Sequence, residues 1–284
     1  MRGELFAVLT LLLILGAGWL AYVWVFERAG DADLLVQSVI GDVQHARADG
    51  RVSQAQEGEA LEREDRIRAG GDGQAVLAFG PQMRVTVTPG SEVVVVDVTA
   101  EGVRLDLEGG EVQATVRPGG GTLGIGAEGR LFEMEDADLR MIRADDGTVA
   151  VESLRGNVRF GVEGATQELH AGERVVAPRG RPPLPPSSSE ELLLQVQWPS
   201  RRSRSERATI SGRTEPGASV RVGGPGEWVT VRAAEDGSFA AETPLAEGVN
   251  EVRVEATSVL GNVGRSSGTL ERDTTAPVVG VEIR

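Results

Sequence analysis

The feature that most constrains this chain is an alternation of apolar and polar residues, which recurs about every eight to twelve residues beyond Phe26. Residues 103–107 and 112–116 each place aliphatic side chains at every second position. Gly109 and Gly110 separate the two runs, and adjacent glycines permit the positive φ that a tight hairpin turn needs. We therefore predict a β-hairpin at this point and an all-β fold for the body of the chain.

The same alternation extends over residues 39–177, which we predict to form one antiparallel β domain. Glycine and proline lie between its runs, and the segment Asp145-Asp146-Gly147 has the composition of a turn. Besides the hairpin, the expected strands of this domain are residues 85–88, 93–98, 149–154 and 158–162.

A proline-rich run marks the end of this domain. Residues 178–189 contain five of the thirteen prolines and end in three serines. Proline lacks a backbone N–H and fixes φ, so this run is unsuited to the interior of a sheet. We predict that residues 178–191 form an extended linker, in which residues 178–189 would span about 35 Å.

Residues 192–284 contain a second series of alternating runs, with turn residues in each gap. About seven short strands within such a length are typical of an immunoglobulin-like β-sandwich. The expected strands are residues 192–198, 208–211, 219–222, 228–232, 238–242, 249–257 and 278–283.

An uncharged run of 22 residues, 5–26, is long enough to cross the roughly 30 Å hydrocarbon core of a bilayer as a helix. It is longer than the apolar part of a cleavable signal peptide, so we predict a retained transmembrane helix. Arg2 precedes the run and acidic residues follow it, so the positive-inside rule places residues 1–4 in the cytoplasm as a short stub. Residues 27–38 are then a juxtamembrane segment, and we expect a bacterial inner-membrane protein with its bulk in the periplasm.

Composition narrows the functional classes. The chain has no cysteine, two histidines and a formal net charge of −14. Without cysteine and with so little histidine, it offers little material for a transition-metal site. The negative charge repels nucleic acid. We therefore expect no nucleic-acid partner, no cofactor and no metal ion.

Three segments match the sequence motifs of known sites but lack the neighbouring structure, residues or spacing that those sites need. Residues 124–129 fit a dinucleotide fingerprint, but no helical pattern follows them, so we predict a flexible turn. Residues 264–268 spell a nucleophile elbow in a domain without histidine, and we predict a loop. The acidic run 133–138 lacks the spacing of a calcium-binding loop, so we predict a solvated charged strand. We expect no catalytic residue and no enzyme activity.

One basic cluster stands out in this acidic chain. Guanidinium groups pair bidentately with carboxylates, so the cluster is suited to an acidic partner, either another envelope protein or a cell-wall glycan. The alternative is a solvated hairpin loop that balances local charge. The candidate partner-binding residues are Arg201, Arg202, Arg204 and Arg207.

The first domain resembles the FecR family, because glycine turns and aliphatic strands agree with that family in order and spacing. The resemblance implies a non-enzymatic periplasmic sensing or scaffolding domain. In the founding type a signal passes to a sigma factor through a substantial cytoplasmic domain. Only residues 1–4 precede the predicted helix here, so we do not expect an anti-sigma role. The matching segments are residues 40–43, 58–61, 65–70, 75–77, 89–93, 108–112, 154–158 and 171–173.

The second domain resembles the bacterial immunoglobulin-like modules of surface proteins and glycan-active enzymes. That family usually has an acidic residue just before its Gly-Asn turn, whereas residues 258–260 have none, which argues against a metal ion there. The matching segments are residues 210–212, 216–218, 220, 236–239, 247–250, 261–262 and 273–277.

These observations lead to one main functional hypothesis and two alternatives. The main hypothesis is a membrane-anchored, non-catalytic periplasmic scaffold that binds an envelope protein or a glycan. The first alternative is a FecR-like protein that signals across the membrane. The second is an accessory module of a glycan-active enzyme.

Overall fold

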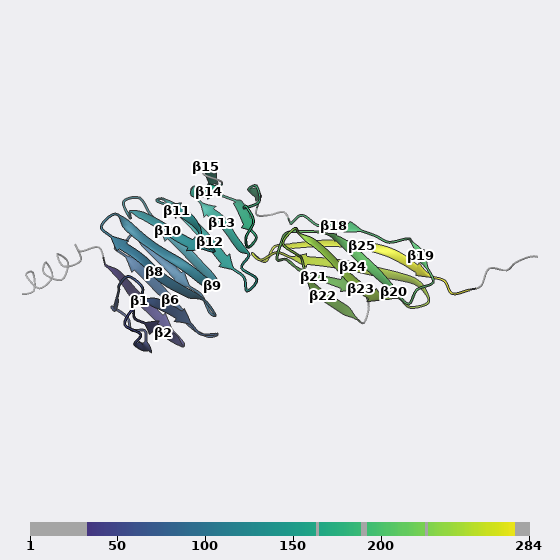
Figure 1. Cartoon of the computed structure of the whole chain (residues 1–284), viewed down its shortest axis with the longest axis horizontal. Coiled ribbons are helices and arrows are strands. Elements are labelled where there is room, and N and C mark those ends of the chain that lie inside the picture. The colour runs from purple at the N-terminus through teal and green to yellow at the C-terminus, as the bar shows by residue number, and fades with distance from the viewer. Residues whose placement is uncertain (1–32, 163–164, 189–191, 225–226, 276–284) are drawn as a thin grey trace, which may run out of the picture.

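The computed structural model describes residues 33–162, 165–188, 192–224 and 227–275 (Figure 1). These residues form strands, turns and loops and contain no helix, so the predicted all-β fold is confirmed for them. Within these ranges no helix is long and apolar enough to cross a membrane. The stub at residues 1–4, the predicted membrane helix at 5–26 and the predicted strand at 278–283 lie outside the described residues.

The first domain consists of two sheets, A and B, which enclose one hydrophobic core. Sheet A contains, in spatial order, β4 (Ala60–Leu61), β1 (Leu34–Ile40), β6 (Gln74–Phe79), β7 (Met83–Val87), the second half of β9 (Gly102–Val116), β12 (Ala137–Arg143), β13 (Val149–Arg155), β16 (Glu173–Ala177) and β17 (Ser187–Ser188). Sheet B contains β3 (Val52–Gln54), β2 (Val43–Ala46), β5 (Arg66–Ala69), β8 (Glu92–Thr99), the first half of β9, β10 (Thr122–Ala127), β11 (Arg130–Met134), β14 (Val158–Val162) and β15 (Ala165–Leu169). Neighbouring strands are antiparallel, except that β9 and β10 run parallel.

β9 is one continuous strand that belongs to both sheets, so the predicted hairpin is wrong. Its first half pairs with β8 up to Gly109, and its second half pairs with β12 from Gly110 onward. Gly110 has a φ of 82°, and a Cβ atom there would lie 2.4 Å from Ser91 Oγ, so the bend requires glycine. The bend moves the buried positions from odd to even residue numbers, so residues 103–107 and 112–116 face one core from successive parts of a single strand.

β10 also replaces a predicted turn. Residues 124–129 were expected to be a flexible turn, but β10 continues through Ala127 and pairs with β9 and β11. The turn itself is confined to Glu128 and Gly129, whose φ values are 50° and 74°. Side chains of neighbouring strands in sheet B cover Gly124 and Gly126 and leave little room for a Cβ atom there. Because these positions are glycine, the sequence of β10 shows little apolar alternation.

The first domain begins earlier than predicted. β1 starts at Leu34, inside the segment 27–38 that we expected to be juxtamembrane. Leu34 and Val36 are 1% and 0% exposed in the core, whereas Leu35 faces outward. Two inward residues are too little alternation to identify a strand from sequence alone.

The second domain is a sandwich of two sheets around a separate core. Sheet C contains, in spatial order, β18 (Gln195–Gln197), β20 (Arg207–Arg213) and β23 (Ser238–Pro244). Sheet D contains β19 (Arg202–Ser203), β25 (Val263–Arg272), β24 (Gly248–Thr257), β21 (Ser219–Gly223) and β22 (Trp228–Arg232). Ile210, Val220 and Val254 are fully buried between the sheets, and burial of each such side chain stabilises the fold by about 1.5–3 kcal/mol.

β25 occupies the segment 264–268 that we predicted to be a loop, so that prediction is wrong. Gly264, Ser266 and Gly268 alternate with more exposed residues along this strand. A Cβ atom at Gly268 would lie 2.7 Å from the ring of Trp198, so the glycine leaves room for the indole. Because the inward positions are small, the sequence shows no apolar alternation there.

The segment after the first domain folds back onto sheet A, and residues 178–191 are not an extended linker over the part that the structure describes. The backbone N–H of Arg181 donates to the carbonyl of Pro178 at 3.3 Å in a turn. The N–H of Leu184 donates to the carbonyl of Val176 at 2.8 Å, and β17 then pairs with the start of β16. The proline-rich segment therefore turns back to sheet A and does not separate the two domains as an extended spacer.

The two domains contact each other on the outer face of sheet A. Ala150 and Val176 of the first domain pack against Leu260 of the second. Beside them Arg174, which is 1% exposed, forms an ion pair with Glu215. Three further polar contacts cross this junction: Arg140 Nη1 to the carbonyl of Leu260 at 2.8 Å, Arg232 to Asp146 at 3.1 Å and Arg181 to Glu235 at 3.2 Å. Apolar packing, a buried ion pair and surface contacts thus hold the domains in one arrangement.

Candidate functional site

The end of the second domain that points away from the first is referred to as the distal end (Figure 1). β20 and β24 begin there, whereas β23 and β25 end there. Its loops are tied together, because Leu245 N donates to the carbonyl of Glu206 at 2.8 Å and Thr274 N donates to Glu247 Oε1 at 2.9 Å. The distal end comprises residues 201–207, 223–224, 227–228, 244–249 and 272–275.

The four candidate arginines all lie at the distal end, and the structure divides them into two pairs. Arg202 and Arg207 form ion pairs with carboxylates of neighbouring strands, at 2.8 and 3.5 Å. Arg201 and Arg204 are exposed and form no ion pair with any residue that the structure describes. Carboxylates of this chain thus offset part of the charge of Arg202 and Arg207, although both side chains stay exposed.

A small hollow of 250 Å³ brings Arg202 and Arg204 together with Asp273 and Thr275. Hydrogen bonds from Thr275 hold the pKa of Asp273 below its ordinary value, and the positive charges of the two arginines add to this effect. Asp273 is therefore ionised at neutral pH and offsets part of the positive charge. The hollow presents mixed charge, which is a weaker anion site than the sequence alone suggested.

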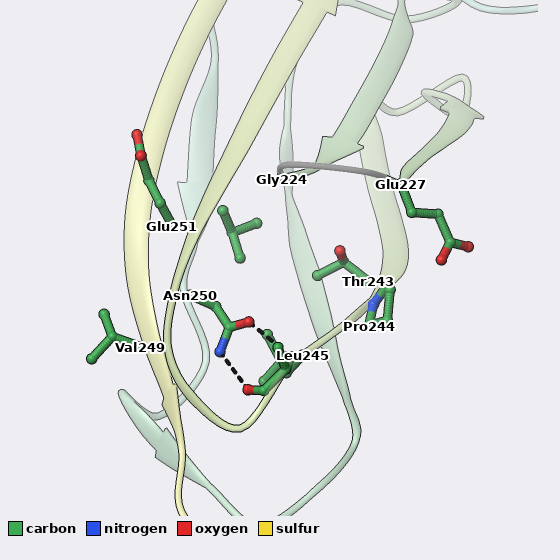
Figure 2. Close-up of a pocket in the computed structure, with 10 residues that line it drawn as sticks. Gly224, Glu227, Thr243, Pro244, Leu245, Val249, Asn250 and Glu251 are labelled. Carbon is green, nitrogen blue, oxygen red and sulfur yellow. Dashed lines mark hydrogen bonds between the residues drawn. The ribbon is translucent and has the colours of Figure 1, made fainter.

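A larger pocket of 720 Å³ opens at the same end of the domain (Figure 2). Pockets that hold ligands or peptide groups fall in this range of volume. The wall is formed by Gly224 and Glu227, the end of β23 and the start of β24, with side chains that include Thr243, Leu245, Val249, Asn250 and Glu251.

Asn250 fixes the turn that forms the floor of the pocket (Figure 2). Its Oδ1 accepts a hydrogen bond from Ala246 N at 2.8 Å, and its Nδ2 donates to the carbonyl of Ala246 at 2.8 Å and to that of Gly248 at 2.9 Å. The amide is thus engaged within the domain. Its role is to hold the start of β24 in place.

The rim of the pocket combines aliphatic and acidic side chains. Val249 is 73% exposed, which is high for a valine in a strand. Glu251 forms an ion pair with Arg253 at 3.1 Å, whereas Glu227 is exposed and forms no ion pair with a described residue. The rim therefore offers both apolar area and negative charge to a partner.

Sequence reasoning did not identify Glu227, Val249 or Glu251. The pocket exists because β24 has 10 residues and its neighbour β21 has 5, so part of β24 extends past the end of β21. In the sequence this difference in length is visible only as the adjacent glycines Gly223 and Gly224, which end β21 early.

The acidic run 133–138 is not one solvated strand. It spans the end of β11 and the start of β12, and three of its carboxylates form ion pairs with arginines in β14, in β13 and just after β9. Burial raises the pKa of Asp138, but hydrogen bonds from Arg117 and Arg155 outweigh burial and hold that pKa below its ordinary value. The pairs are Arg159 with Glu135 at 2.7 Å, Arg155 with Asp136 at 2.7 Å and Arg117 with Asp138 at 2.8 Å.

The first domain contains a buried polar cluster around His45, which is 0% exposed. Its Nε2 lies 2.9 Å from Asp65 Oδ2, and its Nδ1 lies 3.0 Å from Glu59 Oε1. Arg47 Nη2 also donates to Glu59 at 2.6 Å. Burial raises the pKa of Glu59, but hydrogen bonds from Arg47 and His45 outweigh it and leave the pKa lowered. The cluster connects β2 to the turns on either side of β4.

The Glu59→Gln variant should be less stable than the natural protein at pH 7 by about 1.5–3 kcal/mol, the usual contribution of hydrogen bonds to a charged group. The pKa of Glu59 is lower in the folded state than in the unfolded state, so its contribution is present above about pH 4.3 and is lost as the pH falls through the folded pKa. Urea denaturation between pH 3 and pH 7 measures this difference. Glu57→Gln, on the same turn, is the exposed control. An equal difference at both pH values would contradict the assignment.

Two similar solved structures are crystal structures of a "putative anti-sigma factor" from Parabacteroides distasonis ATCC 8503. The first is 15% identical with a TM-score of 0.38, and it covers 43% of this chain and 59% of that chain. The second is 13% identical with a TM-score of 0.38, and it covers 50% of this chain and 68% of that chain. The first similarity thus spans less than two thirds of the solved chain.

No curated protein matches the sequence. The immunoglobulin-like resemblance of the second domain stays a prediction. The family described as FecR protein matches residues 65–159, from the turn before β5 into β14. The central part of the first domain therefore matches the FecR family, as its glycine turns and strands predicted.

Proposed function

We propose that this chain is a membrane-anchored, non-catalytic regulator of the FecR type. In this proposal the helix at residues 5–26 anchors the chain in a bacterial inner membrane, and the FecR-type domain and an immunoglobulin-like domain lie in the periplasm. A partner protein binds the distal end of the second domain, and its binding is relayed to the membrane through both domains. The FecR match over residues 65–159 supports the regulatory class.

The observation that carries the proposal is the fixed junction between the domains. A partner bound at the distal end affects the membrane side only if the two domains move together. The Arg174–Glu215 ion pair and the packing of Leu260 on sheet A provide such coupling. The turn at residues 178–181 and the pairing of β17 with β16 shorten the connection further.

A scaffold, our main hypothesis from sequence, would need no such coupling. An extended spacer between independent domains would let a bound partner sample many positions, which suits tethering. The folded-back connection removes that freedom for the described residues. The junction therefore favours a relay over a tether.

A transcript measurement tests the proposal in the native host. We expect deletion of the gene to change a small set of transcripts and the natural chain to restore them. The Arg174→Ala variant, present in the membrane at the natural level, should fail to restore them because its domains are uncoupled. A chain with residues 5–26 exchanged for an unrelated apolar span should fail as well if the helix itself is recognised.

Two results would contradict this proposal. The first is full restoration by Arg174→Ala, because the junction would then be unnecessary. The second is an unchanged transcript profile after deletion together with loss of an envelope partner from its normal position, which would favour the scaffold.

A further inference from the structure

β24 has one edge that is only partly covered. It pairs with β25 from Gly248 to Thr257, along its whole length. On its other side it pairs with β21 only from Arg253 to Thr257. Among the described residues no strand pairs with this side of β24 between Gly248 and Val252, and this segment forms one wall of the 720 Å³ pocket.

The backbone groups of this segment point into the pocket. Glu271, which lies opposite Val249 in the ladder, donates its N–H to the carbonyl of Arg201 at 2.7 Å, on the side away from β24. Val249 and Glu271 are therefore a non-hydrogen-bonded pair, so the N–H and C=O of Val249 point away from β25. The same holds two residues on, at Glu251. A Cβ atom at Gly224 would lie 2.7 Å from the carbonyl oxygen of Glu251, so this carbonyl points toward the residues that follow β21 and away from β25.

The free edge carries the charge of Glu251 but has neither the proline nor the bulge that protects other sheet edges. Proteins shorten such edges, or place proline, charge or a bulge on them, because an unpaired row of N–H and C=O groups accepts a further strand. Three edge strands of the first domain, β3, β4 and β17, follow this rule with 3, 2 and 2 residues, whereas the edge strand β15 has 5. β24 is regular here, and its pairing with β25 shows no register shift between Gly248 and Val252.

The two faces of the free edge differ in chemistry. Leu245 and Val252, which are 4% and 2% exposed, lie on the inner side and continue the core of the sandwich. Val249, Glu251 and Glu227 lie at the outer rim (Figure 2). Only one of the two rim carboxylates has an ion-pair partner among the described residues. A strand placed here would have aliphatic side chains facing inward and would gain from a basic side chain facing outward.

We propose that the edge of β24 between Gly248 and Val252 binds an extended basic segment of a partner protein as an added β-strand, with aliphatic and basic side chains in alternation. Main-chain hydrogen bonds to Val249 and Glu251 provide the attachment, and the rim carboxylates select positive charge. This inference deepens the proposed function, because it names the chemistry of the partner that the distal end receives.

Peptide binding to the purified full chain in detergent tests the inference without any transcript measurement. The probe is the acetylated, amidated peptide Lys-Val-Lys-Val-Lys-Val-Lys, and the comparison peptide has Glu in place of Lys. We expect the lysine peptide to bind and the glutamate peptide not to bind. Glu227→Arg should weaken binding of the lysine peptide by about threefold to tenfold, because it reverses the unpaired rim charge.

Val249→Pro removes the backbone N–H that points into the pocket but leaves the ladder to β25 intact. It should weaken peptide binding at least tenfold, which corresponds to about 1.4 kcal/mol. Val249→Thr keeps the N–H and is the matched control, with binding close to that of the natural protein. Circular dichroism shows whether the proline variant keeps its strands.

Two half-methylated peptides make the test independent of protein folding. One peptide carries N-methyl groups on the backbone nitrogens of its lysines, and the other on those of its valines. Backbone N–H groups of alternate residues point to the same edge of a strand, so each peptide lacks the N–H groups along one of its two edges. An added strand bonds to β24 through only one edge, so we expect one isomer to lose binding and the other to keep it. Equal binding of both isomers, unchanged binding to Val249→Pro, or no binding of the lysine peptide would overturn the inference. A negative result here leaves the transcript test unaffected, so the two proposals fail separately.

Discussion

Replacing Arg174 with alanine should separate the two domains and lower the free energy of unfolding by about 3–5 kcal/mol, the usual cost of removing one partner from a buried ion pair. The side chain of Arg174 is 1% exposed, and that of its partner Glu215 is 10% exposed. Burial raises the pKa of Glu215, and the charge of Arg174 opposes this rise only in part. Without the arginine, the carboxyl group is left in a site that disfavours its charge.

Three measurements on the full chain check this expectation. Thermal unfolding of the natural protein should show strongly coupled transitions, and the variant should show the two domains unfolding separately. Small-angle scattering should report a longer and more variable particle. Protease cleavage should become faster within residues 178–191, because this segment no longer lies against sheet A next to a docked second domain.

The double variant Arg174→Met with Glu215→Leu is the control that separates charge from packing. Replacing a buried ion pair by apolar residues of similar volume is often neutral or stabilising, so this variant should keep the domains together.

The pH dependence of stability is a second check on the burial of Glu215. The folded pKa of Glu215 is raised, so its favourable contribution is present at low pH and is lost as the pH rises through that pKa. As the pH rises through this pKa, the free energy of unfolding of the natural protein should therefore fall relative to that of the Glu215→Gln variant. The opposite slope would contradict the burial of Glu215.

The strands that were predicted correctly are those whose own sequence shows apolar alternation between turn residues. β22 (Trp228–Arg232) matches the predicted strand 228–232, because its alternation is bounded by turn residues on both sides. β18 is shorter than the predicted strand 192–198, because only its last residues reach β20. β25 was missed because its inward positions are glycine and serine, which carry no hydrophobic signal.

The sheet to which a strand belongs could not be predicted, because it depends on partners far away in the sequence. The alternation at residues 103–107 and 112–116 is the same in a hairpin and in a strand that changes sheets. The neighbours decide between the two: Gly109 pairs with a residue of β8, and Gly110 pairs with a residue of β12. The folded-back linker is a similar case, since the N–H of Leu184 and the strand β17 bond to β16 of the first domain.

The candidate site also has one part that the local sequence shows and one part that depends on distant strands. The arginine cluster was found because exposed charge is a local property of the sequence. The pocket was missed because it results from the different lengths of β21 and β24 and from an edge that no other strand covers among the described residues. Val249 illustrates the difficulty: in sequence it resembles any strand valine, and in the structure it is 73% exposed.

Replacing Gly110 with valine should have a similarly large effect, confined to the first domain. A β-branched residue with a φ near the observed 82° costs about 1–3 kcal/mol in backbone strain. The new side chain would also displace Ser91, since its Cβ would lie 2.4 Å from Ser91 Oγ, and overpacking adds about 1–3 kcal/mol. Ser91 Oγ accepts a hydrogen bond from Glu111 N at 2.8 Å, which this displacement would break. We expect a total loss of about 2–6 kcal/mol.

Hydrogen exchange of the full chain locates the damage. Amide protection should fall in β7, β8 and β12, three of the strands that pair with β9, and should persist in β20 and β24 of the second domain. Gly109→Ala is the matched control, because no positive φ occurs at Gly109 and a Cβ atom there would lie 4.0 Å from its nearest neighbour, Arg143 Nη1. That variant should change stability by less than about 1 kcal/mol. If Gly110→Val kept protection in β7 and β12, the passage of β9 between the sheets would not depend on glycine, and the bend would have to be held by its neighbours alone.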